Sequence, residues 1–147
     1  MKNMLRFAER IQAPPAKVWE IMLADATYRD WTTPFAEGSY FEGSWEQGQQ
    51  ICFRSPGHDG GMVAVIEESR PHSFVSIKHI GQLKEGGVVD TTSEEVKKWA
   101  PAFENYHFTP IDGGTEVRVE MDVTAEWEAY MQQTWPKALA RLKQICE

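Results

Sequence analysis

The segment EWEAYMQQTWPKALARLKQIC, residues 126–146, decides the fold that the sequence predicts. Its apolar residues recur with the i, i+4, i+7 spacing that places them on one face of an α-helix: Met131, Trp135, Ala138, Leu139, Leu142 and Cys146. A helix of about 20 residues is about 30 Å long, enough to cross a whole β-sheet. Pro136 cannot donate a backbone hydrogen bond to Gln132, so a kink is expected there. We therefore predict a long C-terminal helix packed on a sheet.

The sheet is predicted from period-two alternation and turn signals in the rest of the chain. Residues 5–11 alternate between apolar and polar positions, which indicates a strand with one buried face. Turn-forming residues, such as Asp-Gly-Gly at 112–114, separate the further expected strands. These lie at residues 40–45, 49–54, 62–67, 74–83, 102–109 and 115–123. Because no helices alternate with these strands, the sheet is predicted to be antiparallel.

Two short helices are expected between the first strand and the second. Residues 14–22 open with two prolines, which suit the first turn of a helix because an N–H there would have no partner. Asp25 is a candidate N-cap for a second helix that runs to Trp31, and Pro34 ends it.

Residues 84–100 fit no regular pattern and are predicted to form an irregular excursion with one helical turn, capped by Thr92 or Ser93. The chain as a whole is predicted to be a single α+β domain, residues 1–147. Its expected architecture is a curved antiparallel sheet of about six to seven strands around the C-terminal helix.

Composition and charge exclude several classes of function. The chain has 147 residues and a formal net charge of −7, and its Lys and Arg residues form no dense cluster, so neither nucleic acid nor an anionic membrane is an expected partner. No apolar run reaches the roughly 18 residues of a membrane span, and the N-terminus does not resemble a signal peptide. Cys52 and Cys146 form no CxxC motif. We expect a cytoplasmic protein with both thiols free.

Four stretches carry a resemblance to a known family. Residues 11–19 (IQAPPAKVW) and 25–31 (DATYRDW) resemble the opening of the family named for activators of the heat-shock-protein-90 ATPase, in the START-like (SRPBCC) superfamily. Residues 112–119 (DGGTEVRV) and the later Trp135-Pro136 are similar to its closing hairpin and helix. The resemblance implies a helix-grip fold with a cavity between sheet and helix. Members of the superfamily bind lipids, sterols, polyketides or plant hormones, and some catalyse cyclisation or hydroxylation.

Aromatic residues are the candidates for the cavity wall, because rings with one polar edge suit ligand pockets. The alternative is that each one packs the core. Entry is expected to be gated by the loop 55–61 and by the excursion 84–100, both of which contain glycines. The candidate wall residues are Trp31, Trp45, Phe53, Trp99, Tyr106, Phe108 and Trp135.

Glu104 is the most informative polar candidate. It alternates with Tyr106 and Phe108, and the resemblance places that face inside. A carboxylate there is costly unless it is paired, so Glu104 could anchor a polar group of a ligand or serve as an acid or base. The alternative is a register shift, or a hydrated position at the mouth. His79 shares a face with Ile77 and is a second, weaker catalytic candidate, whereas His107 is expected outside.

The sequence contains no motif for metal binding, nucleophilic catalysis or cofactor binding. The histidines lack metal-ligand spacing, and there is no GxSxG elbow or phosphate-binding glycine loop, so no metal, catalytic nucleophile or cofactor is predicted. The favoured hypothesis is the binding of a hydrophobic small molecule, a lipid or polyketide-like compound. The alternatives are a cyclase-type enzyme that uses Glu104 with His79, and a protein-interaction or co-chaperone-like module.

Overall fold

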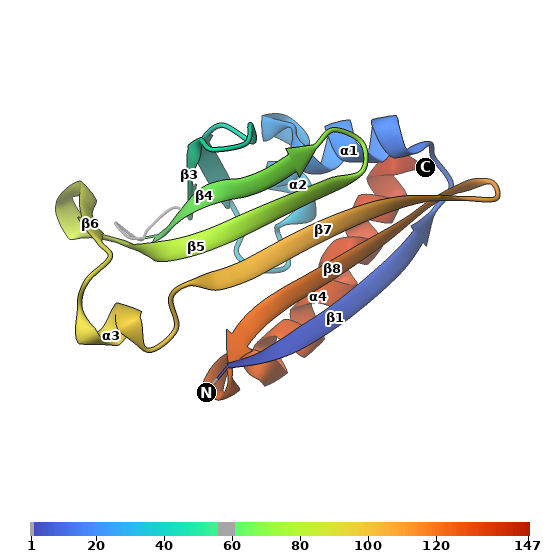
Figure 1. Cartoon of the computed structure of the whole chain (residues 1–147). Coiled ribbons are helices and arrows are strands. Elements are labelled where there is room, and N and C mark those ends of the chain that lie inside the picture. The colour runs from blue at the N-terminus through green and yellow to red at the C-terminus, as the bar shows by residue number, and fades with distance from the viewer. Residues whose placement is uncertain (1, 56–60) are drawn as a thin grey trace.

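The computed structural model describes residues 2–55 and 61–147, so most of the loop 55–61, expected to gate the cavity, lies outside the described residues. Within these residues an eight-stranded sheet curves in front of three helices (Figure 1). In chain order the elements are β1 (Lys2–Ile11), α1 (Pro15–Leu23), α2 (Asp25–Trp31), β2 (Tyr40–Gly43), β3 (Gln50–Arg54), β4 (Gly61–Arg70), β5 (Phe74–Lys84), the 3-10 turn η1 (Glu85–Gly87), β6 (Val88–Asp90), α3 (Glu94–Lys97), β7 (Ala102–Ile111), β8 (Gly114–Thr124) and α4 (Ala125–Cys146).

The sheet is antiparallel throughout, in the order β1-β8-β7-β5-β4-β3-β2. This confirms the predicted curved antiparallel sheet and long C-terminal helix. The chain winds so that β1, its first strand, lies beside β8, and α4 follows β8 directly. The strands of the N- and C-terminal thirds therefore form one edge of the sheet, and α4 crosses behind them (Figure 1).

The excursion 84–100 contains a strand that the sequence did not predict. β6 pairs with the end of β5, with Leu83 opposite Val89, after Gly86 and Gly87 turn the chain with positive φ angles. The expected helical turn is α3, and its N-cap is Ser93, whose Oγ accepts from the N–H of Val96 at 3.2 Å. β6 and α3 lie together at one end of the sheet (Figure 1).

The predicted N-cap of α2 was wrong. Ala24 holds that position without a side-chain cap, because α1 and α2 are separated by this single extended residue. Asp25 is instead the first residue of the helix, where its carboxylate pairs with Arg29 at 3.2 Å. A negative charge in the first turn still favours the helix dipole.

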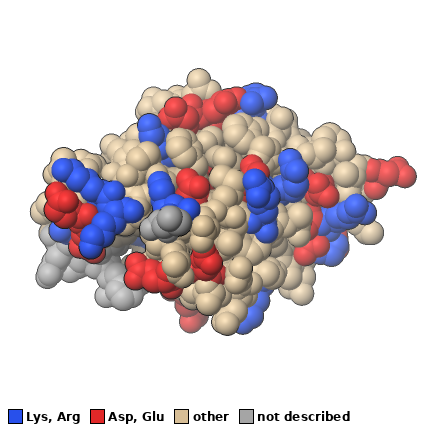
Figure 2. Space-filling view, turned by 60° about the horizontal axis from the view of Figure 1, so that its bottom comes forward, with Lys and Arg blue, Asp and Glu red and all other residues tan. Residues whose placement is uncertain are grey.

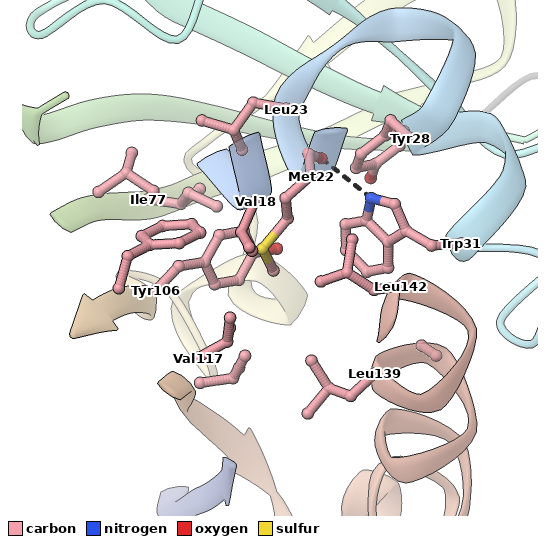
Figure 3. Close-up of a cluster of buried hydrophobic side chains, with 14 of the residues drawn as sticks. Val18, Met22, Leu23, Tyr28, Trp31, Ile77, Tyr106, Val117, Leu139 and Leu142 are labelled. Atoms are coloured by element: carbon pink, nitrogen blue, oxygen red, sulfur yellow. Dashed lines mark hydrogen bonds between the residues drawn. The ribbon is translucent and has the colours of Figure 1, made fainter. Parts of the chain in front are cut away.

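The apolar face of α4 is buried as predicted: Trp135, Leu139 and Leu142 are 3%, 1% and 0% exposed. The helix continues through Pro136, and the kink expected there stays a prediction. Figure 3 shows Leu139 and Leu142 facing side chains from α1, α2 and β8. α1, α2 and α4 thus cover the same face of the sheet, here called the inner face.

Charged residues of both signs are distributed over the surface. On the face shown in Figure 2, Lys and Arg form separate small groups with Asp and Glu among them, not a continuous basic surface. In the part of the chain that the structure describes, no helix is both long and apolar enough to cross a bilayer. Cys52 and Cys146 are free thiols.

Leu139→Ala tests the packing of α4. We expect it to lower the free energy of unfolding by about 2–5 kcal/mol, because it removes a fully enclosed side chain and leaves a cavity. Urea-induced unfolding, followed by tryptophan fluorescence, measures the change. The matched control is Lys137→Ala on the exposed side of the same helix, expected to change stability by less than about 0.5 kcal/mol. Equal effects of the two substitutions would contradict the packing described here.

Candidate functional site

Three polar side chains meet on the inner face of the sheet, and we call His79, Glu104 and Tyr106 the inner polar cluster. Tyr106 Oη donates a hydrogen bond to Glu104 Oε2, and His79 Nε2 lies 3.1 Å from Glu104 Oε1. The side chains of His79 and Glu104 are only 10% and 16% exposed. The two residues that the sequence singled out as acid–base candidates are therefore hydrogen-bonded to each other.

Strand register explains how these residues meet. β5 and β7 pair so that Ile77 lies opposite Glu104 and His79 opposite Ala102. Diagonal neighbours on one face of an antiparallel pair lie within reach of long side chains, so Glu104 reaches His79 across the pair. Tyr106 lies two residues along β7 and points to the same face. The alternation of Glu104 with Tyr106 was therefore a correct signal for an inner position.

Tyr28 of α2, which was not among the predicted site residues, lies close enough to this cluster to feel the charge of Glu104. Burial, and then the negative charge of Glu104, raise the pKa of Tyr28 far above its ordinary value. Burial and the charge of Glu104 likewise raise the pKa of Tyr106. Both phenols therefore stay protonated. The i, i+3 spacing of Tyr28 and Trp31 on α2 was the available sequence signal.

Aromatic rings surround the inner polar cluster. The Tyr28 ring lies 5.3 Å from Trp31 and 6.2 Å from Phe53, and Phe53 lies 5.6 Å from His79. Trp45 lies 5.8 Å from Phe53, and Trp135 of α4 lies 6.0 Å from Tyr106. The structure thus groups four of the predicted wall residues around Glu104 and Tyr106: Trp31, Trp45, Phe53 and Trp135.

Two other predicted wall residues lie apart from these rings. Phe108 is buried but packs against Trp19 of α1, with ring centroids 5.2 Å apart. Trp99 is half-buried in the excursion 84–100 and forms no ring contact within residues 2–55 and 61–147. Phe41, which the sequence analysis missed, lies instead 5.1 Å from Tyr28 and 5.3 Å from Trp45. Phe41 shares a face with Trp45 in the strand predicted at residues 40–45, and this alternation could have identified it.

Several buried polar atoms around the cluster have no hydrogen-bond partner among the described residues. They include His79 Nδ1, Trp45 Nε1 and Trp135 Nε1. By contrast, Trp31 Nε1 donates to the carbonyl of Met22 at 2.9 Å (Figure 3). An unpaired buried donor or acceptor costs about 1–3 kcal/mol, so each such atom is a place where a polar group of another molecule would be stabilised.

The described concavities lie elsewhere. One, of about 160 Å³, lies on β1 and β8 and is lined by Arg6, Phe7, Ala8, Arg118, Val119 and Glu120. The other, of about 180 Å³, lies near the β7–β8 turn and includes Lys143. Neither is lined by the inner polar cluster or by a predicted wall residue. The rings of the inner face contact one another, so a ligand there would have to part them.

A second carboxylate–imidazole pair lies on the opposite face of the sheet. We call His107 and Glu120 the outer pair: His107 Nε2 lies 2.7 Å from Glu120 Oε1, and Arg6 Nε lies 3.2 Å from Glu120 Oε2. The hydrogen bond from His107, with help from Arg6, holds the pKa of Glu120 below its ordinary value. The outer position of His107 agrees with the sequence prediction.

In the described residues no three His, Cys, Asp or Glu side chains are placed to hold a metal ion.

Comparison with known proteins places the chain in a family. The model of the family "Activator of Hsp90 ATPase homolog 1-like protein" matches residues 12–147. The chain belongs to this family. No curated protein is significantly similar to it in sequence.

Solved structures show that this chain has the helix-grip fold. The Aha1 dimer from Colwellia psychrerythraea is 18% identical, with 99% of this chain and 96% of that chain covered and a TM-score of 0.74. MLL2253 from Mesorhizobium loti is 14% identical, with 97% and 95% covered and a TM-score of 0.74. CalU16 from Micromonospora echinospora is 14% identical, with 99% and 77% covered and a TM-score of 0.69. At these identities the similarity shows the fold alone.

The buried tyrosines predict how stability changes in alkali. Tyr28 and Tyr106 keep their protons in the folded protein, whereas in the unfolded chain they lose them above about pH 10. The unfolded state then binds fewer protons, so stability is complete below about pH 10 and falls above it, by up to about 1.4 kcal/mol per pH unit for each tyrosine. Urea unfolding of the wild type and of the double variant Tyr28→Phe/Tyr106→Phe measures this slope. The double variant should show a smaller slope, and identical slopes would contradict the burial of these phenols.

Proposed function

We propose that this chain binds an apolar small molecule between the sheet and α4, with the inner polar cluster as its anchor. The observation that carries the proposal is the Glu104–His79 hydrogen bond within a shell of aromatic rings. A buried carboxylate contributes little to stability compared with an apolar residue of similar volume. A polar pair kept at this position is therefore better explained by recognition than by folding.

The aromatic shell supports the apolar part of the proposed ligand. Phe53 of β3 contacts His79, Trp135 of α4 contacts Tyr106, and Tyr28 of α2 contacts Phe53. An apolar ligand can replace contacts between these rings with contacts between the rings and itself at a small cost in free energy, since both kinds of contact are apolar. The unpaired atoms Trp45 Nε1 and Trp135 Nε1 would add donors for its oxygen atoms.

The experiment is native mass spectrometry of the protein purified from its source cells, together with thermal melting against a panel of lipids and apolar aromatic compounds. We expect a bound apolar molecule, or a rise in melting temperature with at least one compound, because a ligand that binds only the folded state stabilises it. The absence of both a bound molecule and any melting shift would count heavily against the proposal.

Two matched variants locate the site of that binding. Glu104→Gln removes the charge of the inner pair, and we expect it to weaken binding by about tenfold or more, the effect of a lost charge-assisted hydrogen bond. Glu120→Gln makes the same change in the outer pair and should leave affinity unaltered. Titration calorimetry with the compound found above measures both. Equal effects of the two variants would place the binding site away from the inner face.

General acid–base catalysis is a second candidate, favoured by the same pair. Glu104 orients His79, whose Nδ1 has no partner among the residues that the structure describes, and an oriented imidazole is the commonest group for proton transfer. This reading requires turnover of the bound compound as well as binding. Analysis of the recovered ligand for chemical change separates the two.

A protein partner is a third candidate, favoured by exposed aromatic residues at the start of α4. Trp127 and Tyr130 are 50% and 38% exposed, and their rings lie 6.0 Å apart. Tyrosine and tryptophan are enriched at protein interfaces. This surface is separate from the inner polar cluster, so the two roles are compatible.

A further inference from the structure

Glu104 has two hydrogen-bond partners, Tyr106 Oη and His79 Nε2. An ionised carboxylate only accepts hydrogen bonds, so with Glu104 ionised both partners donate to it and His79 carries a proton on Nε2. In a neutral imidazole only one ring nitrogen carries a proton. With that proton on Nε2, Nδ1 is an acceptor with a free lone pair.

That acceptor lies in apolar surroundings. His79 is 8% exposed, and its Nδ1 is buried with no partner in the described part of the chain. The ring centroid of Phe53 lies 5.6 Å from that of His79, and the Trp45 ring lies 5.8 Å from Phe53. A molecule placed against these rings is therefore stabilised if it donates a hydrogen bond to Nδ1, and a molecule of the same shape without a donor leaves Nδ1 unpaired.

We propose that the inner polar cluster selects an uncharged aromatic molecule with a hydroxyl group, whose O–H donates to His79 Nδ1. This inference rests on the proposed function and specifies the ligand. The charge of Glu104 in a buried site disfavours an anion, because like charges repel strongly where water does not screen them. The surrounding rings favour an aromatic body. The hydroxyl group supplies the donor that Nδ1 lacks.

Three probes of similar size test this selection: 2-naphthol, 2-methoxynaphthalene and 2-naphthoate, titrated by calorimetry at neutral pH. We expect the naphthol to bind about tenfold more tightly than the ether, the effect of one neutral hydrogen bond, and the naphthoate to bind most weakly. In His79→Phe the preference for naphthol over the ether should disappear. In the outer-face control His107→Phe it should persist.

The proton position on His79 is tested without any ligand. Nitrogen-15 NMR of the wild-type imidazole distinguishes its two nitrogens, and we expect the proton on Nε2. A proton on Nδ1, or on both nitrogens, would overturn the inference whatever the variants show.

The binding results separate this inference from the proposed function. Equal affinity of the wild type for naphthol and ether, or no binding of any probe, overturns the hydroxyl-aromatic ligand. The proposed function still stands in that case if the panel of lipids and apolar compounds yields a ligand. Failure of both the probes and the panel overturns the two together.

Discussion

The contact of α4 with the inner face of the sheet is the interaction on which the rest of the structure depends. Trp135 lies at its centre and touches four separate segments of the chain: its ring lies 6.3 Å from Phe7 of β1, 5.9 Å from Trp31 of α2, 5.0 Å from Phe35 and 6.0 Å from Tyr106 of β7. Phe7, Tyr106 and the stretch that holds Trp31 and Phe35 are distant from one another in sequence, and each contacts the ring of Trp135 on α4. α4 covers the part of the inner face formed by β1 and β8, and the side chains of His79 and Glu104 are only 10% and 16% exposed, so their hydrogen bond is largely shielded from water.

The two carboxylate–imidazole pairs show what that closure changes. The outer pair, Glu120 with His107, is 24% and 28% exposed, and Glu120 also receives Arg6 as a counter-charge. Both carboxylate oxygens of Glu120 have protein partners, and the pair is open to solvent, so it needs no role beyond the surface. The inner pair has similar geometry but no cation beside it among the described residues, and it leaves His79 Nδ1 unpaired. Buried polar groups without hydrogen-bond partners are uncommon in folded proteins, and they are expected mainly at functional sites.

Sequence periodicity predicted the fold well because the signals are local. The alternation of residues 5–11 and the apolar stripe on residues 126–146 each result from a single strand or helix that buries one face. Such a pattern can be read from one segment without knowing the rest of the fold. The strand β6 was missed because three residues carry no periodicity and form a strand only through pairing with β5. The cap at Ala24 was missed because the junction of α1 and α2 leaves one extended residue, a geometry that residue preferences do not report.

The candidate site was predicted in part for the same reason. Glu104 and His79 could be placed on inner faces from alternation, but their meeting depends on the register of β5 against β7, which the sequence does not state. The grouping of Tyr28 and Phe41 with the predicted rings likewise requires α2 to lie over β2 and β3. Whether rings fill a space or line it depends on summed volumes across several elements, so no single pattern could decide it.

The packed rings also determine where selectivity for a ligand can arise. An apolar molecule that parts Phe53, Trp45 and Tyr28 replaces contacts those rings already make, so its apolar surface gains little over the empty state. A polar group that reaches His79 Nδ1 replaces nothing, because that atom has no partner in the described chain. The difference between one ligand and another therefore depends chiefly on hydrogen bonding at the cluster, and the shared helix-grip fold leaves this property free to vary between relatives. For this reason the residues around Glu104 say more about function than the architecture that encloses them.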